Sequence, residues 1–114
     1  MTIDEKVMGL WHHILSQPTT SAQASIAQIK RRGERLPDIV QNIVDSKDAY
    51  LSGCQKLLEY PPNPAFKNYN PSQSDLEFLQ GLYEKAQVID WEDGNKVKEL
   101  SEELGAYTGY KPFS

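Results

Sequence analysis

His12 and His13 are the only two histidines of the chain, and imidazole is the side chain best suited to proton transfer and metal binding near neutral pH. Neighbouring residues of a helix point about 100° apart, so the two rings cannot hold one metal ion together. The helical pattern around them places His12 opposite the apolar stripe and His13 on its flank. The sequence contains no HExxH motif, no Cys/His cluster and no Glu-x-x-His pair. We therefore predict surface and flank histidines, with no metal ion and no cofactor.

Cys54 is the single cysteine, which excludes an intramolecular disulfide and a zinc site built from two thiolates. Its neighbours on the helical pattern include Tyr50, Leu51 and Leu57, and this apolar setting does not favour a thiolate. We predict a small core residue rather than a nucleophile. The Gly-x-Ser-x-Gly motif, the Walker loop and the dinucleotide fingerprint are also absent.

Four cationic side chains gather within one short segment, at Lys30, Arg31, Arg32 and Arg35. Arginine binds phosphate bidentately, so this basic cluster is a candidate site for an anion or a nucleic acid. Nucleic-acid-binding domains usually spread positive charge over a face, whereas this chain has a net charge of −4 and a pI of about 5.1. We interpret the basic cluster mainly as a cap on a helix dipole, with recognition of an acidic partner or of a nucleic acid as alternatives.

Carboxylates gather in the C-terminal third of the chain. Residues 75–103 contain nine Asp or Glu residues against Lys85, Lys96 and Lys98. Acid–base hydrolysis needs two carboxylates beside a pocket, and the pattern shows no sign of a pocket. Residues 92–95 lack the first and third ligands of a calcium loop. We predict a solvated acidic face, distant from the basic cluster, so that the molecule is polarised in a way that favours oriented association.

Aromatic residues outside the main helical stripes are more numerous than one small core needs. Such side chains are enriched in protein interfaces. For the rings in residues 60–74, the favoured interpretation is structural, with the rings holding a crossover against the bundle, and a docking surface for a partner is the alternative. The predicted partner-binding residues are Tyr60, Phe66, Tyr69, Tyr107, Tyr110 and Phe113.

The elements that position these residues are predicted to be helices, because apolar residues recur at the helical period. Pro18 is expected to end the first helix, and a capping box formed by Thr20 and Gln23 to begin the second. A second box, Ser74 with Glu77, is expected near the start of the fourth helix, and Gly105 is expected to end the fifth. The predicted ranges are 4–16, 21–32, 37–59, 75–89 and 94–104.

The connection between the second and third predicted helices has two interpretations. Apolar residues spaced by seven, from Ile29 through Ile43 to Leu57, fit one rod kinked at Pro37. Gly33 and Pro37 also fit a corner between two separate helices. The sequence leaves this choice open.

The overall prediction is an all-α single domain, a small bundle of four or five helices. Four prolines make residues 60–74 a proline-rich aromatic crossover of extended character, and residues 106–114 form a short extended C-terminal tail.

The function that this pattern favours is a non-catalytic protein-interaction module, such as an adaptor, inhibitor or regulatory subunit, which binds another protein or a second copy of itself. One alternative is a nucleic-acid-associated regulator that uses the basic cluster. Another is a ligand carrier or enzyme with a pocket between helices, built from residues such as His13, Tyr83 and Glu84. The acidic N-terminus, the lack of a long apolar run and the lone cysteine lead us to expect a cytoplasmic protein with no membrane segment.

Overall fold

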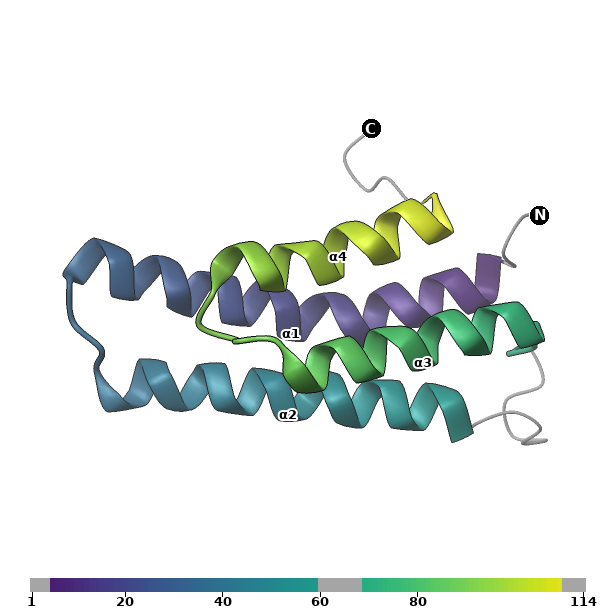
Figure 1. Ribbon diagram of the computed structural model, residues 1–114, viewed down its shortest axis with the longest axis horizontal. Helices are drawn as coiled ribbons and strands as arrows, with labels where there is room; N and C mark the ends of the chain where they lie inside the picture. The colour runs from purple at the N-terminus through teal and green to yellow at the C-terminus, as the bar shows by residue number, and fades with distance from the viewer. Residues whose placement is uncertain (1–4, 60–68, 110–114) are drawn as a thin grey trace.

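The computed structural model describes residues 5–59 and 69–109, which form four α-helices and contain no β-strand. Successive helices run in opposite directions along the long axis of the molecule (Figure 1). The prediction of an all-α bundle is confirmed, with four helices in the described part of the chain. They are α1 (Glu5–Arg32), α2 (Pro37–Glu59), α3 (Gln73–Val88) and α4 (Gly94–Thr108).

Helix α1 corrects one prediction, because Pro18 lies inside it rather than at the end of a shorter helix. A proline in a helix interior removes a hydrogen bond and crowds the preceding turn, at a cost of about 3 kcal/mol. Pro18 is buried, and Leu15 and Ala22 on either side of it belong to the core. Packing of α1 against α2 and α4 offsets the cost. The predicted helices 4–16 and 21–32 are therefore one helix, and Thr20 lies within it.

The α1–α2 connection is a corner and not a kink. Gly33 has a φ of 70°, the left-handed conformation that glycine adopts without strain, and its N–H donates to the Ile29 carbonyl over 2.8 Å. Pro37 then begins α2 at the position where its missing N–H is harmless. Helix α2 folds back along α1, which excludes the single kinked rod (Figure 1).

Two further helix ends differ from the predicted ones. The capping box of α3 is formed by Ser72 and Asp75, so the helix begins two residues earlier than predicted and Ser74 lies inside it. Helix α4 continues past Gly105 because Thr108 is still buried, and it ends at Gly109 with a φ of 71°. In both cases the sequence offers a second candidate cap near the one that the structure uses.

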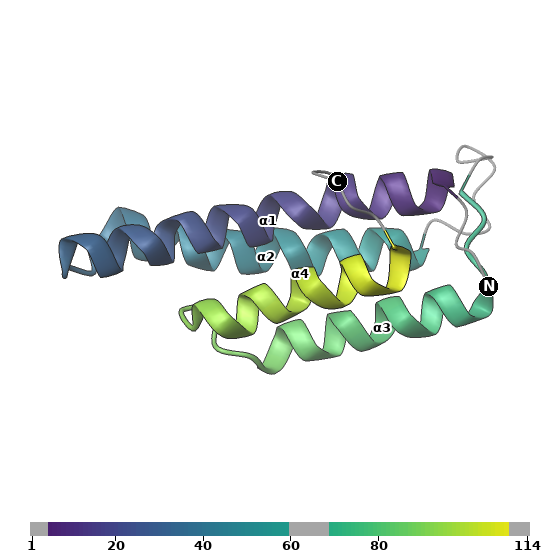
Figure 2. The ribbon, with the colours of Figure 1, turned by 90° about the horizontal axis from the view of Figure 1, so that it is seen from above.

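The helices surround the core in the cyclic order α1, α2, α3, α4 (Figures 1 and 2). Close backbone packing joins α1 to α2, α2 to α3, and α1 to α4. Helices α3 and α4 make at most marginal backbone contact along their described length. The α3–α4 seam of the bundle is thus left open.

Tyr69 closes the bundle at the end where α2 finishes. Its hydroxyl accepts a hydrogen bond from Trp11 Nε1 at 2.9 Å and donates one to the Leu57 carbonyl at 2.8 Å. That carbonyl lies in the last turn of α2, where it has no partner within the helix. The ring of Tyr69 is buried, which agrees with the structural interpretation of this residue and leaves no ring face for a partner.

Candidate functional site

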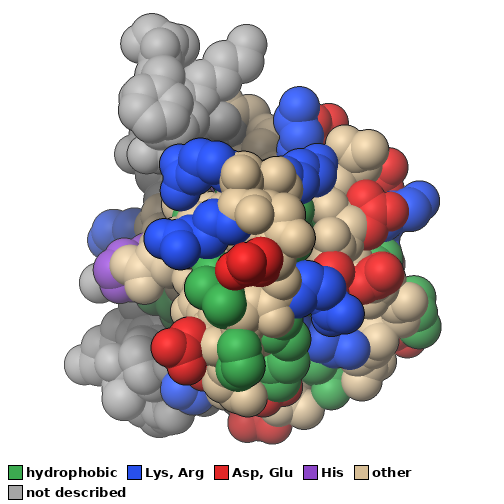
Figure 3. All heavy atoms as spheres, turned by 90° about the vertical axis from the view of Figure 1, so that its left-hand side faces the viewer, with side chains coloured by type: hydrophobic (Ala, Val, Ile, Leu, Met, Phe, Trp, Pro, Cys, Tyr) green, Lys and Arg blue, Asp and Glu red, His purple; other side chains and the backbone are tan. Residues whose placement is uncertain are grey.

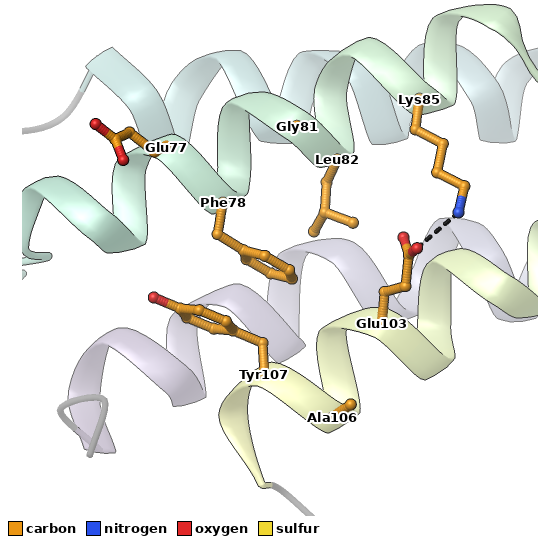
Figure 4. Close-up of a pocket in the computed structure, with 8 residues that line it drawn as sticks. All are labelled: Glu77, Phe78, Gly81, Leu82, Lys85, Glu103, Ala106 and Tyr107. Atoms are coloured by element: carbon orange, nitrogen blue, oxygen red, sulfur yellow. Dashed lines mark hydrogen bonds and ion pairs between the residues drawn. The ribbon is translucent and has the colours of Figure 1, made fainter. Parts of the chain in front are cut away.

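A groove of about 600 Å³ runs along the open seam between α3 and α4 (Figure 4). It is the natural consequence of two antiparallel helices whose backbones do not approach each other. Five of the lining residues come from α3 and three from α4: Glu77, Phe78, Gly81, Leu82 and Lys85, then Glu103, Ala106 and Tyr107.

A stacked pair of rings bridges one end of the groove. Phe78 and Tyr107 point toward each other from α3 and α4, with ring centroids 4.0 Å apart and planes inclined by 6° (Figure 4). The Tyr107 hydroxyl donates to Asp75 Oδ1 at 2.6 Å, so the ring is tied to the first turn of α3. Burial and the hydrogen bond to this carboxylate raise the pKa of Tyr107 to about 12. The fully buried ring of Trp11 lies beneath the pair, about as far from Phe78 as from Tyr107.

An ion pair bridges the groove toward its other end. Lys85 Nζ lies 2.7 Å from Glu103 Oε1 and 3.7 Å from Glu99 Oε2. The hydrogen bond to Glu103 raises the pKa of Lys85. These side chains are partly exposed, and exposed pairs contribute only about 0–1 kcal/mol. The ion pair therefore does more to define the shape of the groove than to stabilise the fold.

Between these two bridges the groove has an apolar floor and a wide mouth. The floor includes Leu82, which is buried. Gly81 and Ala106 are exposed at the mouth, and a Cβ atom at Gly81 would have no atom within 4 Å. Two small residues thus leave open the space that larger side chains would fill.

The groove offers few groups that could take part in chemistry. Its titratable side chains are two carboxylates, one lysine engaged with Glu103, and a tyrosine that stays protonated well above neutral pH. Cys54 is buried elsewhere in the core, and burial raises the pKa of its thiol to about 12. Within residues 5–59 and 69–109, no group of three or more metal-ligating side chains lies together.

The two histidines lie the other way round from the prediction. His12 is partly buried, with Nε2 2.7 Å from Thr108 Oγ1 on α4, whereas His13 is exposed. Burial lowers the pKa of His12. The prediction was wrong because α4 packs against the side of α1 that carries His12.

The basic cluster lies at the α1–α2 corner, where cationic side chains gather beside acidic ones (Figure 3). Arg35 is bound to Glu92 of the α3–α4 connection, with Nη2 2.6 Å from Oε2. The predicted separation of basic and acidic ends is therefore wrong at this point, since the antiparallel fold returns residues 90–93 to the same end. Lys30, Arg31 and Arg32 are exposed, but consecutive residues point about 100° apart and do not make one flat face.

Of the six aromatic residues predicted to bind a partner, the structure places one at the groove. That residue is Tyr107, while Tyr69 belongs to the core. Tyr60, Phe66, Tyr110 and Phe113 lie outside the described residues.

Of the residues named for an alternative pocket, His13, Tyr83 and Glu84, none lines the groove, and Tyr83 accepts a hydrogen bond from Gln55 Nε2 of α2. The sequence analysis did not nominate the groove residues on α3. The signal that identifies them is Phe78, which lies off the main apolar stripe of its helix and turns toward α4.

Comparisons with known proteins add no family assignment: no family model, no curated protein and no solved structure matches this chain significantly. Among the helices of the described residues, none combines the length and the apolar character needed to span a bilayer.

Proposed function

We propose that this protein is a non-catalytic interaction module that receives an amphipathic helix of a partner protein in the groove between α3 and α4. The observation that carries the proposal is the open α3–α4 seam, with the rings of Phe78 and Tyr107 at its edge. Adaptors, inhibitors and regulatory subunits all work by surfaces of this kind.

The shape of the groove favours a helix as the occupant. The groove is bounded by two antiparallel helices, so a third helix lying along it contacts both walls by the same side-chain packing that joins helices inside a bundle. Its volume of about 600 Å³ lies within the usual range of about 300–1,000 Å³ for binding sites. Helix-in-groove recognition depends on apolar anchors at i, i+3, i+4 and i+7, which Leu82 and the two rings can accept.

The proposal is tested by selecting helical binders from a library of random peptides of about 16 residues, long enough for four turns. Each selected peptide is then titrated against the wild-type protein, Gly81→Leu and Gly9→Leu. Gly81→Leu fills the mouth of the groove. Gly9→Leu is the matched control, because Gly9 is an exposed glycine of α1 where a Cβ also meets no atom within 4 Å.

The expected result is that Gly81→Leu weakens binding by about tenfold or more, a loss of about 1.4 kcal/mol. Gly9→Leu should bind like the wild type. Thermal unfolding of each variant shows that it is folded. Selected peptides that bind all three proteins equally, or a selection that returns no peptide, contradict the proposal.

A further inference from the structure

The charges around the groove identify the chemistry of its occupant. Residues 73–108, which form both walls of the groove and their connection, carry nine carboxylates against three lysines. Of these carboxylates, Glu77 and Glu103 line the groove, so its apolar floor lies in an acidic field. A cationic segment is drawn into such a field, and an acidic one is repelled.

Unneutralised negative charge flanks the apolar part of the groove on both sides. At the aromatic end, Glu77 is exposed and has no ion pair among the described residues. At the other end, Glu99 and Glu103 share the single Lys85. The cations available within the groove are thus fewer than its carboxylates.

We infer that the partner segment is a cationic amphipathic helix, with apolar side chains over about two turns and a Lys or Arg near each end of them. This inference rests on the proposed function. Glu77 and Lys85 are eight positions apart on α3, which corresponds to about 12 Å along a helix axis. The two basic residues of the partner are therefore about eight residues apart, one beside Glu77 and one beside Glu99 and Glu103.

The first test is the composition of the peptides whose binding Gly81→Leu weakens. Expected are apolar residues at helical spacing, with Lys and Arg in clear excess over Asp and Glu at the flanking positions. If the peptides whose binding Gly81→Leu weakens show no excess of Lys and Arg, the inference is overturned and the proposed function stands. Absence of any groove-dependent peptide overturns both.

The second test uses one selected peptide and a synthetic copy in which every Lys and Arg is replaced by Glu. The original should bind about tenfold more tightly or better in low salt, and the difference should shrink as added salt shortens the screening length. Equal affinity for the two peptides, or a preference for the acidic copy, overturns the inference.

The third test distinguishes the effect of a local contact beside Glu77 from the effect of the net charge of the protein. Glu77→Gln removes one charge at the groove, and Asp48→Asn removes one on the exposed face of α2, where the structure shows no contact with the groove. Glu77→Gln should weaken the binding of the basic peptide several-fold more than Asp48→Asn does. Equal effects of the two variants contradict the placement of a partner cation beside Glu77.

Sedimentation of the wild-type protein tests whether a second copy of this chain fills the groove instead. The inference expects a monomer over the concentrations used for titration. A dimer that Gly81→Leu dissociates and Gly9→Leu preserves shows that the groove accepts a second copy, and it overturns the assignment of a separate cationic partner.

Discussion

The α1–α2 seam and the α3–α4 seam each contain a helical glycine, but the two glycines have opposite surroundings. A Cβ atom at Gly53 of α2 would lie 2.6 Å from Ile14 Cγ2 and 3.3 Å from Leu15 Cδ2 of α1. A Cβ atom at Gly81 of α3 would meet nothing within 4 Å. Glycine allows close approach in the first seam, and it leaves space in the second.

The difference between the seams lies in what else spans them. Phe78 stacks on Tyr107 and Lys85 reaches Glu103, so side chains cross from α3 to α4 while the two backbones stay apart. At the α1–α2 seam no bulky side chain separates the helices at Gly53, and the backbones come together. A small residue therefore predicts close helix packing only where the flanking side chains allow it.

The strongest test of this comparison is the same substitution in both seams. Gly53→Leu should lower the free energy of unfolding by about 3 kcal/mol, because the added side chain displaces the β-branched Ile14, which is stiff at χ1. Gly81→Leu should raise it by about 0.5 kcal/mol, because leucine is the better helix former. Urea denaturation measures both, and similar losses in the two variants would show that the α3–α4 seam is closed.

Two buried tyrosines provide the next largest contrast. Tyr69→Phe should cost about 2 kcal/mol, because Trp11 Nε1 and the Leu57 carbonyl both lose their partner in the core. Tyr50→Phe should leave stability unchanged or raise it slightly, because the buried Tyr50 hydroxyl has no hydrogen-bond partner among the described residues. Thermal melts of both variants measure these changes in stability. An equal loss of stability in Tyr50→Phe and Tyr69→Phe would refute the assignment of hydrogen bonds to Tyr69 and of none to Tyr50.

The pH dependence of stability should distinguish the α1–α4 seam from the exposed side of α1. Burial lowers the pKa of His12 in the folded protein, so below its ordinary value of 6.5 the unfolded chain binds more protons. This contribution to stability is present above pH 6.5 and is lost as the pH falls toward the folded-state value. His12→Gln should reduce the loss of stability between pH 7.5 and 5.5, whereas the His13→Gln variant should show the same loss as the wild type. Urea midpoints at the two pH values test the assignment, which fails if the two variants behave alike.

The smallest expected effect belongs to the ion pair across the groove. A double-mutant cycle with Lys85→Ala and Glu103→Ala should give a coupling energy below about 1 kcal/mol, because the pair is partly exposed. A coupling well above this value would mean that the ion pair holds α3 and α4 together, and the groove would then be a stable structural seam.

Local chemistry allowed much of the fold to be predicted from the sequence. Pro37 marks the start of α2, and apolar periodicity identifies the buried residues Ile43, Tyr50 and Leu57. Pro18 was misjudged because the local cost of a proline says nothing about the packing of α1 against two neighbours. Local rules are reliable where local interactions dominate the free energy, and they fail where tertiary contacts outweigh them.

The candidate site was much less predictable. Tyr107 was predicted to bind a partner only because it is aromatic. The same reasoning predicted partner binding for Tyr69, which is a core residue. Gly81 and Ala106 carry no chemical signal, since their importance lies in the space beside them. An open seam depends on the distance between two helices, and the periodicity of each helix does not encode that distance.

We propose that partners bind at the open α3–α4 seam and leave the α1–α2 seam untouched. The most direct measurement is a ¹⁵N–¹H correlation spectrum of the protein titrated with a selected basic peptide. We expect the largest amide shifts at groove residues such as Gly81, Lys85 and Ala106, with Gly53 and Ser46 of α2 unchanged. Largest shifts on the α1–α2 face, around Ser21 and Asn42, would contradict it.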